Sequence, residues 1–389
     1  MILVFGFACA FLLSAISMPL ILKVAHSRKL YDAIDDRKIH TGNIPRLGGL
    51  GIFLSFVATF ALFTQVTGLG VSTGERFWTV ILCMLAVHLI GLVDDFRNLR
   101  AVYKFLIEFA VAAVLVASGF RFGAIVLPFG AGSLGLGAFS YPLTILWIIG
   151  VTNALNLIDG MDGLAGGIAA LAAAVFGIFF VLTGNTGAAL VCFILVGVVF
   201  GFLVFNLPPA KIFMGDSGAL FLGFSLSILP LIGPASGRTE IGLVPTITVL
   251  LLLILDTLSA MIRRILIGVS VFTPDKSHLH HKLLDLGLGV KGALAVIMSA
   301  QSLLCLVALS GLVFARETSF FINISAWLGF VLLFFALGAA RRRVEYRNRV
   351  MRQGSFGDVK PQSSREAYHV AMTASFVKDD FDTKGVSTK

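Results

Sequence analysis

Long apolar stretches recur about every 20 to 30 residues along this chain of 389 residues, and they restrict the possible folds more than any other feature. A helix needs about 20 apolar residues to cross a hydrocarbon layer of roughly 30 Å. Hydrophobic residues make up 57% of the chain and charged residues only 13%, unlike the composition of soluble domains. We therefore expect an all-α polytopic membrane protein, not a string of soluble domains.

Eleven stretches predict transmembrane helices, whose connecting loops lie alternately on the two sides of the membrane. They lie near 1–25, 47–66, 77–93, 101–120, 141–158, 163–183, 187–206, 218–234, 241–262, 291–314 and 319–340. The first has no Lys or Arg before its apolar run and no small-residue cleavage site, so it predicts a retained span and not a signal peptide. The Gly-rich segment 121–140 predicts a short periplasmic hairpin. We expect residues 1–340 to form one transmembrane bundle and residues 341–389 a polar, disordered cytoplasmic tail.

Basic residues predict the orientation of these helices. Loops on one side of the bundle carry thirteen Lys and Arg residues, whereas loops on the other side carry four. Cytoplasmic loops are enriched in Lys and Arg, so we place the first set in the cytoplasm. The four cysteines all fall far apart inside apolar stretches, which provides neither a disulfide framework nor a Cys-x-x-Cys pair.

Six aspartates lie at or near the predicted cytoplasmic ends of the spans: Asp94, Asp95, Asp159, Asp162, Asp216 and Asp256. A charge at mid-bilayer costs about 2.5–3.5 kcal/mol, so these side chains must face a wet cavity, a cation or one another. Several carboxylates at one face favour a divalent cation, and oxygen ligands suit Mg²⁺ or Mn²⁺. Capping a helix or solvating a loop remains the alternative for any one of them.

Other polar residues accompany these acids. Lys104 lies one or two turns into the helix that follows the Asp94-Asp95 pair, which suits a site for a metal ion and a diphosphate. Asn153 and Asn156 share a helix face, and the glycines after them would let a ligand approach the backbone. Apolar spans have little reason to hold two Asn and two Asp so close together unless they bind something polar.

The first loop, the Met-Gly-Asp segment and a histidine cluster complete the set. Arg46, with Arg37 and Lys38, could neutralise phosphate, although such a loop is also typical of positive-inside topology. Asp216 has glycines on both sides, so we favour a metal ligand over a helix N-cap. A zinc site at the histidines is conceivable, but no Cys lies near, and hydrogen bonds to a diphosphate fit better. This cluster comprises His278, His280 and His281.

In order and spacing, these five motifs resemble the polyprenyl-phosphate N-acetylhexosamine-1-phosphate transferases, in particular the bacterial undecaprenyl-phosphate N-acetylglucosamine-1-phosphate transferases that start cell-surface polysaccharide synthesis. The resemblance runs from the first loop to about His281. It implies an eleven-span bundle in the bacterial inner membrane with a cytoplasmic active site. One departure is Asn98, where many members have a third acid after the Asp-Asp pair.

The resemblance implies Mg²⁺ as cofactor, UDP-N-acetylhexosamine as donor and undecaprenyl phosphate as acceptor. We expect Asp216 and Asn156 to be metal ligands. The expected catalytic residues are Asp94, Asp95, Asp159, His280 and His281. The expected substrate-binding residues are Lys104, Asn153, Asp162, Arg46 and His278. Asp94 or Asp159 would accept a proton from the lipid phosphate, if one is still bound.

Two rival functions make different predictions. A proton-coupled transporter would place its acids near the bilayer midplane and break helices in paired halves. A CDP-alcohol phosphotransferase would carry Ala-Arg shortly after its Asp-Gly, and Asp159-Gly160 lacks this continuation. We expect membrane lipids but no nucleic acid as partners. The sugar, including a 6-deoxy N-acetylhexosamine, the prenyl length and a homodimer are left open by the sequence.

Overall fold

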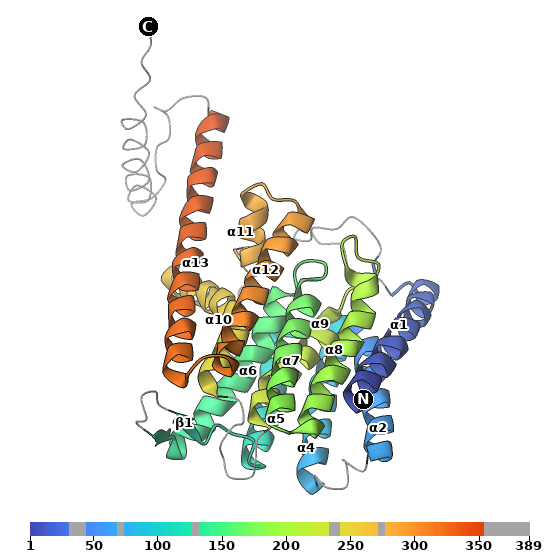
Figure 1. Cartoon of the computed structure of the whole chain (residues 1–389). Coiled ribbons are helices and arrows are strands. Elements are labelled where there is room, and N and C mark those ends of the chain that lie inside the picture. Colours follow the sequence, from blue (N-terminus) through green and yellow to red (C-terminus); the bar gives the residue numbers. More distant parts are fainter. Residues whose placement is uncertain (31–43, 68–73, 127–131, 233–241, 271–276, 354–389) are drawn as a thin grey trace.

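The computed structural model describes residues 1–30, 44–67, 74–126, 132–232, 242–270 and 277–353. This part of the chain is largely helical, as the apolar stretches predict (Figure 1). Its long helices are α1 (Ile2–Arg28), α2 (Gly48–Thr67), α4 (Gly74–Arg97), α5 (Ala101–Ala117), α6 (Ser140–Ile158), α7 (Leu164–Leu182), α8 (Thr186–Asn206), α9 (Gly215–Ile228), α10 (Leu243–Leu266), α12 (Val290–Ala308) and α13 (Arg316–Gln353). Shorter elements are α11 (Leu279–Asp285), η1 (Gly137–Phe139), η2 (Leu229–Leu231) and η3 (Leu309–Leu312).

Each of the eleven predicted stretches coincides with one of these long helices, so the all-α polytopic fold is confirmed. Within the described residues, nine helices are long and apolar enough to cross a membrane. Two of the eleven are shorter, because α5 has 17 residues and α9 has 14 before it continues into η2. At 1.5 Å per residue, 17 residues span only about 25 Å, slightly less than the hydrocarbon layer.

The predicted hairpin in the Gly-rich segment is confirmed, while its periplasmic location stays a prediction. Strands β1 (Ala124–Val126) and β2 (Ser133–Gly135) pair antiparallel, with Ala124 opposite Gly135. The hairpin lies at the end of the bundle opposite α11 (Figure 1). It joins α5 to α6 without crossing the bundle again.

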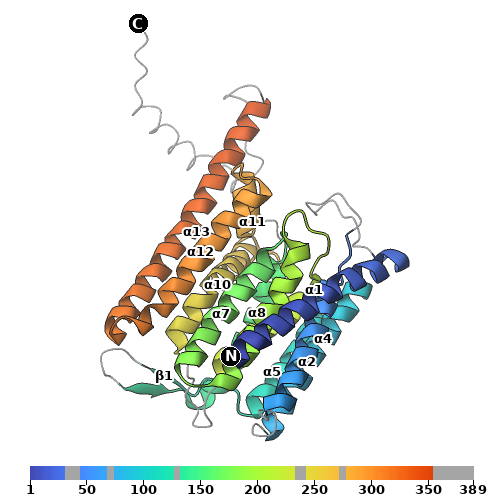
Figure 2. The same ribbon diagram turned by 45° about the vertical axis from the view of Figure 1, so that its right-hand side comes forward.

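Small residues allow the helices to pack closely. An added Cβ at Gly197 of α8 would lie 2.5 Å from the Phe7 carbonyl oxygen of α1, and one at Gly201 would lie 2.6 Å from the Ser14 Cβ. Helices in lipid gain little from hydrophobic burial, so close backbone approach of this kind is a main source of their association. α1, α2 and α4 thus gather on one side of α8, while α10, α12 and α13 lie on the other side of the bundle (Figure 2).

α9 is the buried centre of the bundle. All of its residues except Asp216 are buried, and it packs against α2, α4 and α6. Its first turn lies against two glycines: an added Cβ at Gly49 would be 2.2 Å from the Gly218 nitrogen, and one at Gly91 would be 2.6 Å from the Ser217 Cα. The fold therefore fixes the start of α9, where Asp216 lies.

The last helix differs from the prediction of a tail that begins at residue 341. α13 continues to Gln353, well beyond the apolar stretch (Figure 1). Arg341 explains part of this extension, because its Nε lies 2.9 Å from Glu345 one turn later and 2.8 Å from Asp285 of α11. Paired charges at this spacing stabilise a helix in water. Residues 354–389 lie outside the described part of the chain.

Candidate active site

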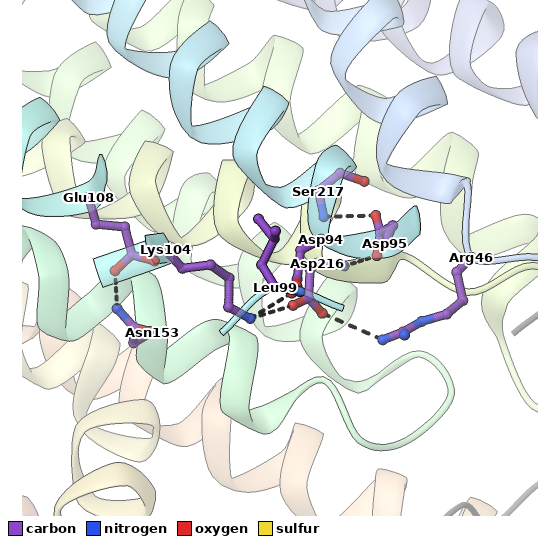
Figure 3. A network of polar contacts seen from close by, with 9 residues as sticks. All are labelled: Arg46, Asp94, Asp95, Leu99, Lys104, Glu108, Asn153, Asp216 and Ser217. Carbon is purple, nitrogen blue, oxygen red and sulfur yellow. Dashed lines mark hydrogen bonds and ion pairs between the residues drawn. The ribbon is translucent and has the colours of Figure 1, made fainter. Parts of the chain in front are cut away.

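Lys104 joins two carboxylates that are 122 positions apart in the sequence. Its Nζ donates to Asp94 Oδ2 at 2.7 Å and to Asp216 Oδ2 at 2.8 Å (Figure 3). Asp94 also accepts from the Leu99 backbone nitrogen at 2.5 Å, which closes the turn between α4 and α5. The end of α4, the start of α5 and the start of α9 thus meet at one point. Each charge is at least partly shielded, because the Asp94 side chain is only 9% exposed and that of Lys104 20%.

Asp95 holds the first turn of α9. Its two carboxylate oxygens accept from the backbone nitrogens of Asp216 at 2.7 Å and Ser217 at 3.1 Å. A carboxylate at a helix N-terminus satisfies free N–H groups and opposes the positive end of the helix dipole. Gly215 enters this turn with a φ of +74°, where an added Cβ would lie 2.7 Å from Asp95 Oδ1. Asp95 therefore positions Asp216, although its predicted part in catalysis stays a prediction.

The segment before α2 forms another wall of the site. The Phe213 nitrogen donates to the Pro45 carbonyl at 2.8 Å, and the Gly48 nitrogen donates to the Phe213 carbonyl at 2.9 Å. These bonds bring Arg46 to Asp216, with Nη2 3.5 Å from Oδ1 (Figure 3). The Arg46 side chain is 30% exposed, so it also faces solvent. The predicted phosphate-neutralising residues Arg37 and Lys38 lie outside the described residues.

A sixth charged residue, Glu108, extends the network, and the sequence analysis missed it. Glu108 is buried and accepts a short hydrogen bond from the Asn153 amide of α6 (Figure 3). Its other oxygen, Oε1, is buried without a hydrogen-bond partner among the described residues. The signal was its spacing, since Glu108 lies one turn after Lys104 on α5. Asn156 lies one turn after Asn153 in α6, between Asn153 and Asp159 in the sequence, and is half-buried.

The turn between α6 and α7 carries Asp159 and Asp162. Asp159 is half-buried, and burial, together with the charge of Asp216, raises the pKa of Asp159 to about 7. Asp162 Oδ2 accepts from the Ala210 nitrogen at 2.9 Å, while Asn206 accepts from the Gly163 nitrogen at 2.9 Å. These two bonds fasten the turn to the segment that leads into α9. The predicted role of Asp162 in substrate binding stays a prediction.

The histidines lie over the same turn. His278 Nδ1 lies 2.8 Å from Asp256 Oδ2, and Asp256 Oδ1 accepts from the Leu279 nitrogen, so Asp256 of α10 fixes the start of α11. His280 is 1% exposed and packs on Gly160, where an added Cβ would lie 2.7 Å from Nε2. Burial lowers the pKa of His280 to about 3, so the ring is neutral near pH 7.

Both His280 ring nitrogens are buried without hydrogen-bond partners among the described residues. A buried imidazole in this state is costly unless a ligand completes its hydrogen bonds. The His281 ring is tilted against it, with ring centroids 4.2 Å apart. The structure therefore brings His280 to the turn of Asp159, with both ring nitrogens lacking a hydrogen-bond partner among the described residues.

Within the network of described residues around Asp216, five acidic side chains accompany two cations. Asp94, Asp95, Glu108, Asp159 and Asp216 accompany Arg46 and Lys104. Within the described ranges, no three acidic, His or Cys side chains are arranged to hold a metal ion. Mg²⁺ does not need such a set, because it is usually bound by one or two carboxylates and substrate phosphates. The oxygen donors of Asp216 and its neighbours fit that mode, with the cations available for phosphate charge.

Comparisons with known proteins identify relatives that match most of the chain. A family model described as glycosyl transferase family 4 matches residues 77–233. A protein of Bacillus subtilis (strain 168), named a probable undecaprenyl-phosphate N-acetylglucosaminyl 1-phosphate transferase, is 35% identical over 335 residues, which is 86% of this chain and 89% of the relative. The chain belongs to this family. The resemblance drawn from the motifs is thereby confirmed.

Two further relatives are also similar to this chain. A decaprenyl-phosphate N-acetylglucosaminephosphotransferase of Mycobacterium tuberculosis (strain CDC 1551 / Oshkosh) is 33% identical over 310 residues, 73% of this chain and 76% of the relative. An undecaprenyl-phosphate alpha-N-acetylglucosaminyl 1-phosphate transferase of Salmonella typhi is 29% identical over 340 residues, 86% of this chain and 89% of the relative. The family 4 region contains Asp94, Lys104 and Asp216. The histidines of α11 lie beyond it.

Proposed function

We propose that this family 4 transferase moves N-acetylglucosamine 1-phosphate from UDP-N-acetylglucosamine to undecaprenyl phosphate and releases UMP. The names of the relatives support the sugar phosphate and the polyprenyl phosphate acceptor. The UDP-linked donor is our inference from the chemistry of such a transfer. A rival from another class, a membrane transporter, gains no support from these relatives.

One observation carries the proposal: Lys104 bridges Asp94 and Asp216 where the end of α4 meets the start of α9. Arg46 contacts the other carboxylate oxygen of Asp216. Two cations held by carboxylates in a partly dry site are positioned before any substrate arrives. Phosphoryl transfer depends mainly on such positioning and on electrostatic stabilisation of spreading phosphate charge. The cluster is therefore suited to a diphosphate substrate.

In the proposed reaction, an oxygen of the lipid phosphate forms a bond to the β-phosphorus of the donor. The bond from that phosphorus to the bridging oxygen breaks, and UMP leaves with the electron pair. Arg46 and Lys104 neutralise the phosphate charges, and the neutral His280 donates a hydrogen bond to a phosphate oxygen. Asp95 and Asp256 hold these groups in place through α9 and α11.

Asp159 is better suited than Asp94 to accept a proton from the lipid phosphate. Asp94 is already engaged by Lys104 and by the Leu99 nitrogen. Among the described residues no Lys or Arg pairs with the Asp159 carboxylate, and burial raises the pKa of Asp159 to about 7. A lipid phosphate that still carries a proton would pass it to Asp159, although most are ionised near pH 7 because the second phosphate pKa is about 6.

We propose Mg²⁺ as the cofactor of this reaction, with Mn²⁺ as the alternative ion. Asp216 and Asn156 would hold it, with Asp94 nearby. When bound, the ion supplies positive charge for the diphosphate and helps to orient it. The protein side chains supply the remaining neutralisation and the shape of the site.

The proposal also includes the setting of the reaction. The distribution of basic residues supports an inner-membrane enzyme whose site and C-terminus face the cytoplasm. The lipid-linked product would start a cell-surface polysaccharide. A 6-deoxy N-acetylhexosamine remains the alternative sugar, since a small change in pocket contacts, worth about 1–3 kcal/mol, would accommodate it.

The test is a donor panel. Purified protein is incubated with undecaprenyl phosphate, Mg²⁺ and several UDP-sugars, and both UMP and the lipid product are measured by mass spectrometry. We expect UMP and an undecaprenyl diphosphate N-acetylglucosamine in equal amounts, and neither after chelation of Mg²⁺. Turnover with only a 6-deoxy donor would select the alternative sugar. Absence of UMP with every donor would overturn the proposed reaction.

A further inference from the structure

α11 lies between the site and the last helix of the chain. The start of α11 is fixed by Asp256, and the ring of His280 in α11 packs on Gly160. With only seven residues, α11 is too short to be a stable helix alone, so its position depends on what it packs against. One side of α11 faces the turn of Asp159, and α11 also contacts α12 and α13.

α13 contacts α11 through two charged side chains. The Lys282 ammonium lies 5.3 Å from the centre of the Phe334 ring, and Lys282 is only 5% exposed. Arg341 Nε lies 2.8 Å from Asp285 Oδ2 at the last residue of α11. A cation over an aromatic ring gains when it is shielded from water, as Lys282 is. We call residues 334–345 of α13 the C-terminal brace.

The N-terminal part of α13, away from α11, is fixed by hydrogen bonds to α10 and η3. Trp327 Nε1 donates to Thr248 Oγ1 of α10 at 2.7 Å, and Thr248 donates to Asn323 Oδ1 at 2.6 Å. Asn323 donates to the Ser319 carbonyl at 2.8 Å, and the hydroxyls of Ser310 and Ser319 are 2.8 Å apart. Buried hydrogen bonds of this kind hold helices together in a membrane, where unpaired polar groups are costly.

α13 is therefore anchored at one end and touches α11 at the other. The helix is continuous from Ser319 to Glu345, a length of about 40 Å at 1.5 Å per residue. The part beyond residue 340 is longer than a span needs, yet it is the part that reaches Asp285. Figures 1 and 2 both show it rising beside α11 at the site end of the bundle.

We infer that the C-terminal brace positions the histidine helix over the Asp159 turn, with Arg341 as a positioning residue that acts through Asp285. Arg341 does not touch the site itself. It limits how far the end of α11 can move, and so keeps His280 buried on Gly160. The effect on turnover rests on the proposed function, whereas the effect on His280 burial does not.

The experiment measures His280 burial directly. The full-length protein in detergent is treated with diethyl pyrocarbonate near pH 7, and modification of His280 is followed by tandem mass spectrometry. Wild-type protein should protect His280. Arg341→Ala and Asp285→Ala should each raise its modification rate by roughly threefold to fivefold, the order expected when a partly exposed ion pair is lost. The double variant should match either single variant, because both remove the same contact.

Matched controls come from the same helix. Arg342 is exposed, and among the described residues it is Arg341 that pairs with Asp285 and Glu345, so Arg342→Ala should leave His280 protected. Glu345→Ala removes the partner within α13 but keeps Asp285, and it should also behave as wild type. Thermal unfolding of each variant reports any general loss of stability.

The outcomes separate the inference from the proposed function. Faster His280 modification in Arg341→Ala, together with a threefold to fivefold lower kcat/KM for UMP release, supports the brace. Unchanged His280 protection in both Arg341→Ala and Asp285→Ala would overturn it, whatever the activity. The same loss of protection in Arg342→Ala would also overturn it, because the effect would then lie in the helix and not in the ion pair. If His280 responds as expected while wild-type protein releases no UMP, the brace stands and the proposed reaction fails.

Discussion

Burial shifts the pKa values of Asp159, in the turn after α6, and His280, in α11, in opposite directions. A buried site disfavours the charged form of each, so the acid becomes harder to ionise and the imidazole harder to protonate. Asp159 therefore titrates near pH 7, while His280 stays neutral down to about pH 3. At the residue scale, only Asp159 of the two changes charge in the range where such an enzyme works.

The first prediction is an acidic limb in the pH profile. Since the pKa of Asp159 is about 7, its basic form is present above that pH and is lost as the pH falls. We expect kcat/KM for UMP release to fall towards tenfold per pH unit below about pH 6.5. Asp159→Asn should be slower and should lack this limb. An identical limb in Asp159→Asn would contradict the base assignment and point to the phosphate of the lipid instead.

At the scale of elements, the start of α9 determines the geometry of the site. Asp95 binds its first two backbone nitrogens, while Gly49 of α2 and Gly91 of α4 pack against the same turn. Asp216 is the one residue of α9 that is not buried, so the other residues hold it at the solvent-facing end. Changes that do not touch substrate should therefore alter activity by moving this turn.

The second prediction concerns Asp95. Asp95→Ala removes both acceptors from the start of α9 and should lower the free energy of unfolding by roughly 1–2 kcal/mol. Asp95→Asn keeps one acceptor oxygen and should lose less stability and less activity. Thermal unfolding in detergent and UMP release measure the two effects. Full stability of Asp95→Ala with no turnover would instead indicate that Asp95 acts on substrate.

The third prediction concerns helix packing. Gly91→Ala would place a Cβ 2.6 Å from the Ser217 Cα, so α4 must move away from α9. Overpacking of this kind costs about 1–3 kcal/mol, and we expect a lower melting temperature and weaker activity. Gly329→Ala of α13 is the matched control, since nothing lies within 4 Å of the added Cβ. Equal melting temperatures for the two variants would contradict the packing argument.

At the scale of the whole molecule, hydropathy predicted the helices because membrane crossing imposes a length and an apolar surface on each one. It could not predict that Asp94 and Asp216 share Lys104, because that contact depends on how α4, α5 and α9 pack. The family motifs assigned Asp94, Lys104 and Asp216 to one site, but they did not predict this contact. Glu108 was missed because it lies inside an apolar stretch, and the extension of α13 was missed because its apolar stretch ends before the paired charges of Arg341.

The fourth prediction tests the orientation of the bundle. A nucleotide sugar cannot cross a sealed bilayer, so it reaches a cytoplasmic site only from the cytoplasmic side. Inverted membrane vesicles should release UMP from added UDP-N-acetylglucosamine, whereas right-side-out vesicles should do so only after detergent treatment. Equal activity in intact right-side-out vesicles would place the site on the periplasmic face and reverse the topology.

The central claim is that Lys104, Asp94 and Asp216 form the place where the phosphate is transferred. The most direct measurement is the initial rate of UMP release by purified Lys104→Ala and Asp216→Asn, beside Lys211→Ala, an exposed residue in the segment leading to α9. We predict losses of at least about a hundredfold for the first two, as for other preorganised charged groups, and a wild-type rate for the third. Wild-type rates in Lys104→Ala and Asp216→Asn, with folding intact, would contradict the account.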